Sequence, residues 1–141
     1  MELLTSETIE NSYRHYSNLY YGEPHDFPYG TRPTGIGKPH YEIKKDGKIL
    51  FISTDRAVET KRRETYDIEE FMYWIFSDFA MGHGWAYAYK KSNLSGDLRR
   101  VVFPKALDSI ERISPEWRDK LEKQLIKILE NHPYNDSGYD T

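Results

Sequence analysis

Residues 66–91, YDIEEFMYWIFSDFAMGHGWAYAYKK, form the stretch that decides the fold, because no other segment of the chain is apolar on nearly every side. Asp67 and Glu70 have the spacing of a capping box, in which each side chain accepts from the other residue's backbone N–H at a helix start. At about 100° per residue, one face of the helix carries apolar side chains. These are Ile68, Phe71, Met72, Ile75, Phe79, Ala86 and Tyr89, with Phe76 at the edge. The stretch therefore predicts a long central helix.

A second apolar stripe runs along the opposite side of this helix and consists of Trp74, Met81 and Trp85, with Asp78 among them. A helix that is apolar all round is usually buried between layers, so one interpretation is that other elements cover the stripe. The other is that part of it binds a partner, since Trp and Tyr dominate binding energy at interfaces. Beyond Gly82 and Gly84 the helix is weakened. Its aromatic end is where we expect exposure and the partner.

Segments before the central helix predict one helix and a small sheet. Apolar residues at helical spacing indicate a first helix that runs to about Tyr20 and is ended by Gly22. Thr5 or Ser6 is available as its N-cap. A Gly/Pro-rich loop at about 22–39 follows, pinned by Phe27 and Tyr29. Two β-rich runs flank Asp46-Gly47, which predicts a hairpin with a type I′ turn. Residues 57–65 supply a third strand, whose Lys61-Arg62-Arg63 run is typical of a solvated edge.

Segments after the central helix predict two more helices. The first begins at Ser95 or Asp97 and runs to Ile110, with either a kink or a new start at Pro104. The last begins at Ser114-Pro115, with Ser as N-cap and Pro at the first helical position. One face of it carries Trp117, Leu121, Leu125, Ile128 and Leu129, and a polar tail occupies about 134–141. The fold class is therefore α+β, a small antiparallel sheet packed with about four helices, as one domain over 1–141.

Composition excludes several function classes. A net charge of −3 argues against a nucleic-acid binder and suits a basic partner. The chain has no cysteine, and its first residues lack the basic and apolar regions of a signal peptide. No run approaches the ~20 apolar residues of a membrane span. We expect a cytoplasmic protein that binds neither membrane nor nucleic acid directly.

Chemically active side chains do not assemble into a recognisable catalytic set. The five histidines lack metal-ligand spacing on any expected helix, and no Gly-x-Ser-x-Gly elbow occurs. His83, between two glycines, is expected to be buried and hydrogen-bonded. Asp97 with Arg99 and Arg100 indicates a structural clamp more than a charged site. We therefore expect no enzyme, metal or cofactor, and a hydrolase using His40 or His83 is a minor alternative.

Five short motifs follow one another in a fixed order along the chain. They are PHYEI at 39–43, YDIEEFMYWIF at 66–76, GDLRRVVF at 96–103, SPEW at 114–117 and ILENHPYND at 128–136. This ordered series resembles the immunity protein 63 family of bacterial polymorphic toxin systems. The likeness runs from about Pro28 to Asp136. The aromatic HGWAYAYKK at 83–91 departs from the pattern and marks a candidate partner-selecting surface.

The resemblance implies a stoichiometric immunity protein that binds and neutralises a cognate toxin domain in the bacterial cytoplasm, without catalysis. A nuclease toxin with a basic cleft would suit acidic residues beside aromatic anchors. The alternative is a non-catalytic small-ligand-binding or regulatory α+β domain, with the Gly/Pro loop and hairpin closing over an aromatic pocket. The candidate partner-binding residues are Asp78, Trp85, Tyr87, Tyr89, Asp97, Tyr134 and Asp136.

Overall fold

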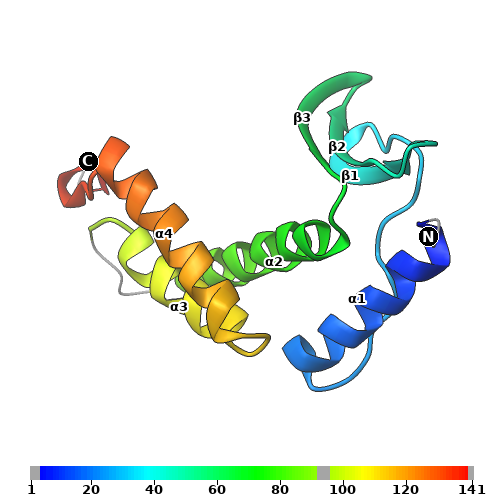
Figure 1. Ribbon diagram of the computed structural model, residues 1–141. Helices are drawn as coiled ribbons and strands as arrows, with labels where there is room; N and C mark the ends of the chain where they lie inside the picture. The colour runs from blue at the N-terminus through cyan, green and yellow to red at the C-terminus, as the bar shows by residue number, and fades with distance from the viewer. Residues whose placement is uncertain (1–3, 92–95, 140–141) are drawn as a thin grey trace. The chain divides into compact units, whose positions relative to one another are not determined.

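The computed structural model describes residues 4–91 and 96–139 and shows an α+β fold with a three-stranded antiparallel sheet and four α-helices (Figure 1). The expected fold class is confirmed. The chain divides into two compact units, one up to Met72 and the other from Tyr73 onward. The long central helix α2 (Ile68–Lys90) begins in the first unit and continues in the second.

Helix α1 (Ser6–Tyr21) has the boundaries that local sequence signals predict. The Thr5 side chain accepts from the Thr8 N–H, and the Thr8 side chain accepts in return from the Thr5 N–H, which makes a capping box. Gly22 ends the helix in the left-handed region at φ 84°. Ile9, Tyr13 and Tyr20 are buried, as the helical spacing of apolar residues indicates.

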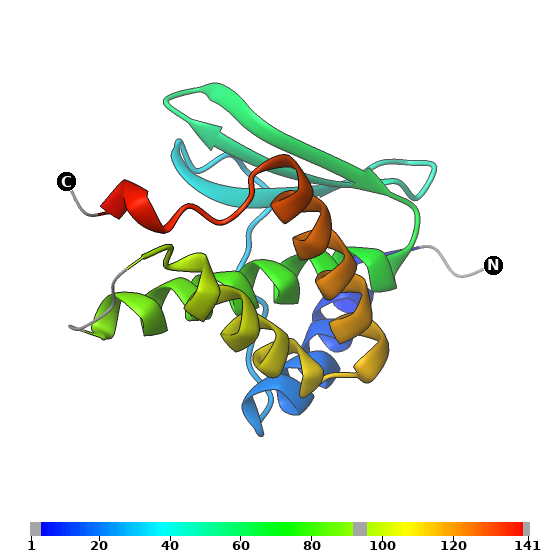
Figure 2. The same cartoon turned by 90° about the vertical axis from the view of Figure 1, so that its left-hand side faces the viewer.

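The sheet has the order β1-β2-β3, with β1 (Ile36–Ile43), β2 (Ile49–Asp55) and β3 (Val58–Thr65) paired antiparallel (Figure 2). The expected hairpin and third strand are confirmed, and β3 is an edge strand whose side chains are mostly exposed. The segment before β1 is pinned as expected, because Phe27 stacks on Tyr41 of β1 at 5.2 Å between ring centroids. Phe71 of α2 adds an edge contact with Phe51 of β2 at 5.1 Å.

The turn between β1 and β2 differs from expectation in its geometry. Gly47 has φ 93° and its N–H donates to the Lys44 carbonyl, while Lys44 N–H donates to the Lys48 carbonyl. This is a three-residue loop ending in a left-handed glycine, so the expected two-residue type I′ turn at Asp46-Gly47 was wrong. Positive φ values at both central positions occur instead between β2 and β3, at Arg56 (52°) and Ala57 (66°).

Replacing Ala57 with glycine is expected to raise the free energy of unfolding by about 0.5–1 kcal/mol, because left-handed backbone costs an L-residue about 1–2 kcal/mol and glycine almost nothing. The same change at the exposed Ala86 inside α2 should lower it by about 1 kcal/mol. Urea unfolding of both variants checks the pair. Destabilisation by Ala57→Gly would contradict the strain assigned to this turn.

The second unit packs α2 from Tyr73 onward with α3 (Arg99–Glu111) and α4 (Pro115–Asn131), and α3 and α4 contact each other. The unit ends in a short 3-10 helix, η1 (Asp136–Tyr139). Its core consists of Tyr73, Ala80, Ala88, Val102, Phe103, Ala106, Ile110, Leu121 and Leu125. Ser114 caps α4 by accepting from the Trp117 N–H, and Pro115 occupies the first turn, as expected. Helix α3 continues through Pro104 without a second start.

Two details of the helices correct the sequence interpretation. Asp67 caps α2 by accepting from the Glu69 N–H, and its own N–H donates to the Thr65 hydroxyl, so the capping box with Glu70 was wrong. Ile128 of α4, placed on the buried face, is 41% exposed. The expected cap Ser95 lies outside the described residues. The Asp97 side chain accepts from the Arg99 N–H at the start of α3.

The buried side of α2 in the second unit also differs from the expected apolar face. Ala86 and Tyr89 are exposed, whereas Ala80, Gly84 and Ala88 are buried. Small side chains repeat every fourth residue there, and they let α3 approach closely. A pattern of large apolar residues does not predict such a face, because the Ala and Gly residues that form it have the smallest apolar side chains.

Candidate functional site

The seven candidate partner-binding residues all lie in the second unit and fall into two groups. Asp97, Tyr134 and Asp136 lie together where the chain enters α3 and leaves α4. Trp85, Tyr87 and Tyr89 lie on the last turns of α2, and Asp78 lies two turns earlier on a similar face. Asp78 and Trp85 are each partly buried.

Asp97 is the centre of the first group, and its side chain is only 3% exposed. Its Oδ2 accepts from Arg99 Nη2 at 2.6 Å and from the Asn135 N–H at 3.0 Å. Arg99 also donates from Nη1 to the His132 carbonyl and from Nη2 to the Pro133 carbonyl. The hydrogen bond from the Arg99 guanidinium is the largest cause that holds the pKa of the Asp97 carboxyl well below its usual range. Asp97 and Arg99 thus tie the start of α3 to the segment after α4.

Asp136 and Tyr134 extend this clamp toward the surface. Asp136 Oδ1 accepts from the Asp97 N–H at 2.8 Å and from Arg100 Nε at 3.0 Å. The Arg100 guanidinium lies 4.1 Å from the centroid of the Tyr134 ring. The hydrogen bond from Arg100 lowers the pKa of the Asp136 carboxyl. Both aspartates are therefore paired with arginines, the arrangement that the sequence favoured as a structural clamp.

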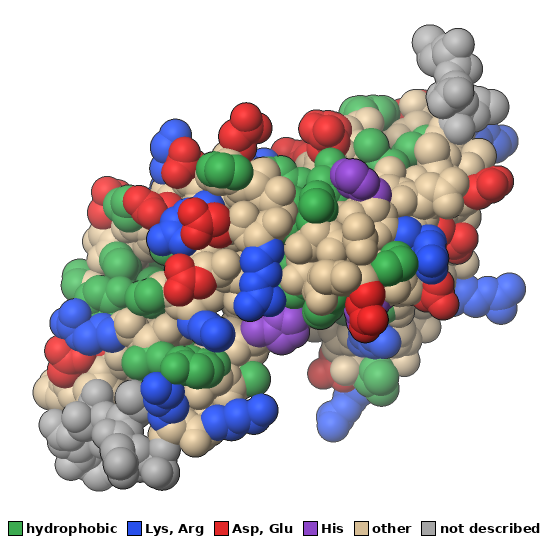
Figure 3. Space-filling view, turned by 90° about the horizontal axis from the view of Figure 1, so that it is seen from below, with side chains coloured by type: hydrophobic (Ala, Val, Ile, Leu, Met, Phe, Trp, Pro, Cys, Tyr) green, Lys and Arg blue, Asp and Glu red, His purple; other side chains and the backbone are tan. Residues whose placement is uncertain are grey.

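The end of α2 presents the second group differently. The Trp85 ring stacks on the Tyr89 ring with 5.8 Å between centroids, and Tyr89 is 72% exposed while Trp85 packs partly against the core. Tyr87 is exposed, and the ammonium groups of Lys91 and Lys105 lie 4.8 and 4.7 Å from its ring centroid. Figure 3 shows basic side chains interspersed with hydrophobic ones at its lower left.

Sequence reasoning missed the two lysines beside Tyr87. Lys91 follows Tyr87 by four residues, so helical spacing alone could have paired them. Lys105 comes from α3 and has no such signal. It reaches Tyr87 because Gly84 lets the two helices meet: a Cβ at Gly84 would lie 2.7 Å from the Val102 carbonyl oxygen.

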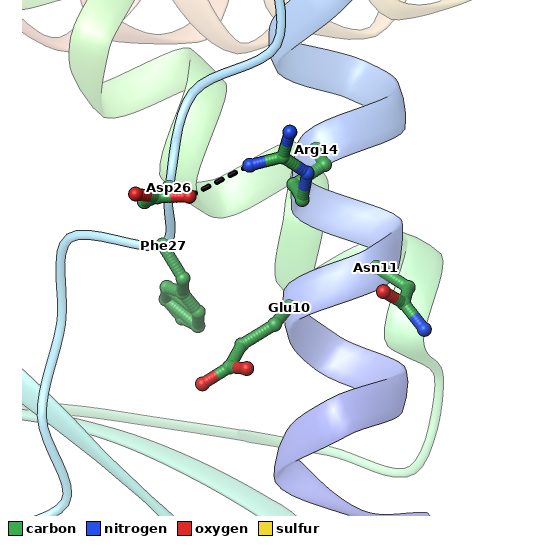
Figure 4. Close-up of a pocket in the computed structure, with 5 residues that line it drawn as sticks. All are labelled: Glu10, Asn11, Arg14, Asp26 and Phe27. Carbon is green, nitrogen blue, oxygen red and sulfur yellow. Dashed lines mark hydrogen bonds and ion pairs between the residues drawn. The ribbon is translucent and has the colours of Figure 1, made fainter.

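A pocket of about 240 Å³ lies in the first unit, lined by Glu10, Asn11 and Arg14 of α1 and by Asp26 and Phe27 of the following loop. Figure 4 shows the Arg14 side chain directed at Asp26, and the ion pair spans 2.6 Å. Phe27 is the one aromatic residue of this lining. The ligand-binding alternative expected a pocket lined by Tyr and Trp, which differs from this lining.

The two histidines of the hydrolase alternative differ in burial. His40 is buried, and its Nε2 lies 3.0 Å from Glu42 Oε2, a hydrogen bond that is the main cause lowering the pKa of the Glu42 carboxyl. His83 is exposed, so its expected burial was wrong. Within residues 4–91 and 96–139, no group of three or more His, Asp or Glu side chains could hold a metal ion. In the same part of the chain, no helix is long and apolar enough to cross a membrane.

Fold and site together define a small α+β protein whose paired charges support the structure and which presents an exposed tyrosine, Tyr89, on the end of its long helix. A family model described as Immunity protein 63 matches residues 45–127, and the chain belongs to this family. Membership in an immunity-protein family implies toxin neutralisation, typically without catalysis. The match confirms the resemblance, while PHYEI and the segment after Lys127 lie outside it. Neither the search of curated proteins nor that of solved structures found a match.

Proposed function

We propose that this chain, acting as one domain over residues 1–141, binds a cognate toxin domain stoichiometrically and neutralises it in the bacterial cytoplasm. Family membership supports neutralisation, and the exposed Tyr89 ring stacked on the partly buried Trp85 at the end of α2 is the observation that supports the binding surface. Immunity by stoichiometric binding needs a rigid contact surface and no reacting groups.

The geometry of the pair suits an interface anchor. Tyr and Trp provide large contact area at low conformational cost, and both are enriched among residues that dominate binding energy. Trp85 is held partly in the core, and its stacking on Tyr89 restricts the tyrosine before binding. Little ordering then remains to oppose association.

The remaining candidate residues have separate roles in this proposal. Tyr134 and Asp136 border the surface, Asp78 extends it along α2, and Asp97 is a positioning residue that holds the α3 entrance. If the toxin is a nuclease with a basic cleft, Asp136 is better placed than Asp97 to meet it. Its side chain is 53% exposed, whereas that of Asp97 is 3% exposed.

Tyr89→Ala is expected to weaken binding to the toxin domain encoded by the neighbouring upstream gene by about 30-fold, the effect of losing about 2 kcal/mol at an interface anchor. Titration calorimetry with the purified domain measures this. Tyr66→Ala is the matched control, because Tyr66 is 63% exposed and lies in the first unit. When toxin and variant are co-expressed, cells with Tyr89→Ala should grow more slowly than cells with Tyr66→Ala.

The proposed surface would be wrong if Tyr66→Ala weakened binding and Tyr89→Ala did not. The function itself would be wrong if the unaltered chain formed no complex with the toxin domain and gave no protection in cells.

A further inference from the structure

A lysine–tyrosine patch, defined as Tyr87, Tyr89, Lys90, Lys91 and Lys105, covers the end of α2 and the adjoining turn of α3. Tyr87 is the centre, with the Lys91 and Lys105 ammonium groups over its ring. The cation–π contacts hold both ammonium groups at the Tyr87 ring although their like charges repel. The patch is therefore arranged before any partner arrives.

The positive charge of this patch is not offset by an ion pair with any carboxylate among residues 4–91 and 96–139. In the part of the chain that the structure describes, no ion pair involves Lys90, Lys91 or Lys105. The nearest acids in sequence after α2 are Asp97 and Asp108, of which Asp108 follows Lys105 by three residues. Asp97 already pairs with Arg99, and Asp108 with Arg118. Residues 92–95 have the sequence SNLS, which contains no acid.

The sign of the patch is thus opposite to that of the whole chain. The chain carries −3, while the patch carries three lysines. A hydrogen bond from Lys91 is the main cause that lowers the pKa of the Tyr87 phenol, so its hydroxyl is a better hydrogen-bond donor than an ordinary tyrosine. Two ammonium groups and such a phenol together match acceptor oxygens with negative charge.

We infer that the toxin surface that docks on the end of α2 carries a cluster of Asp or Glu carboxylates, which pair with Lys91 and Lys105 while Tyr89 supplies the apolar contact. This inference rests on the proposed function and adds the charge of the partner surface. It selects a protein carboxylate cluster over nucleic-acid phosphate because the family is one of immunity proteins and the chain as a whole is acidic. The toxin would then make two contacts of opposite charge. Its acidic residues would meet the end of α2, and its basic residues would meet other parts of this chain.

The test measures association rates with the toxin domain encoded by the upstream gene, at low and high salt. The double variant Lys91→Glu/Lys105→Glu is expected to associate at least about tenfold more slowly at low salt, and the difference should shrink toward 1 M salt, where the Debye length is about 3 Å. The matched control is Lys123→Glu/Lys127→Glu, which makes the same charge change on exposed lysines of α4. Equal melting temperatures establish that both variants fold.

The outcomes separate the inference from the function on which it rests. Slower association of the patch variant alone supports the inference. Equal slowing of both variants, or of neither, overturns it and leaves the immunity function standing. Binding of a single-stranded oligonucleotide by the unaltered chain, abolished in the patch variant, also overturns it in favour of phosphate. Absence of any complex with the unaltered chain removes the proposed function and the inference together.

Discussion

Asp97→Ala is expected to lower the free energy of unfolding by about 3 kcal/mol or more, the cost typical of breaking a buried ion pair from one side. The carboxylate accepts from the Arg99 guanidinium, the Arg99 N–H and the Asn135 N–H. Alanine would leave these donors without their acceptor, and the Arg99 side chain is only 18% exposed, so water replaces the lost contacts poorly. Urea unfolding measures the difference.

Asp136→Ala is the control for this result. Asp136 and Arg100 are about half exposed, so solvent screens their ion pair and Asp136→Ala should lower the free energy of unfolding much less than Asp97→Ala. Equal losses in the two variants would show that burial of Asp97 does not decide the energetics of the clamp.

Lowering the pH should also remove the contribution of Asp97 to the free energy of unfolding. Because the Asp97 pKa in the folded chain lies below its value of about 3.9 in the unfolded chain, its stabilisation is complete above that value and is lost as pH falls toward the folded pKa. The unaltered chain should therefore lose more stability between pH 7 and pH 3 than Asp97→Asn. An identical pH dependence would contradict the assigned pKa direction.

Gly84→Val is the second large expected effect, a loss of about 3 kcal/mol, at the upper end of the usual cost of overpacking. A Cβ at this position would lie 2.7 Å from the Val102 carbonyl oxygen and 3.1 Å from its Cγ1. The nearest atom belongs to the backbone of α3, which cannot move aside as the end of a flexible side chain could. The two helices would have to separate, and the core between them would loosen.

Gly82→Val tests whether space or helix propensity causes this loss. Gly82 lies in the same helix, and a Cβ there would meet nothing within 4 Å. Valine has a somewhat better helix propensity than glycine, so this variant should change stability by no more than about 0.5 kcal/mol, in the favourable direction. If Gly82→Val lowered the free energy of unfolding as much as Gly84→Val, the cause would lie in the backbone of α2 and not in its contact with α3.

Gly84→Val would also move Lys105 away from Tyr87, because the Gly84–Val102 contact brings α3 to the end of α2. Stability of the fold and arrangement of the patch are thus linked through one glycine. Binding studies of the patch therefore need the surface lysine variants, which leave this contact intact.

Elements defined by neighbours in sequence were predictable. The Thr5 and Ser114 caps, Gly22 at a helix end and the hairpin around Gly47 all depend on residues within a few positions of each other. Their energies are local, so a pattern of residue types suffices to place them. The exact turn types were less predictable, because Arg56 and Ala57 adopt a conformation that neither residue favours.

The amino-acid sequence by itself determined the order and kind of the elements and the family of the protein, and the partner surface at the end of α2 stays a prediction from it. Only the tertiary structure decided which side of α2 is buried, that Asp97 is enclosed by Arg99 and Asn135, and that Lys105 stands beside Tyr87. These features depend on contacts between residues far apart in the chain. Their energies come from packing distance and burial, which residue types at fixed spacing do not encode.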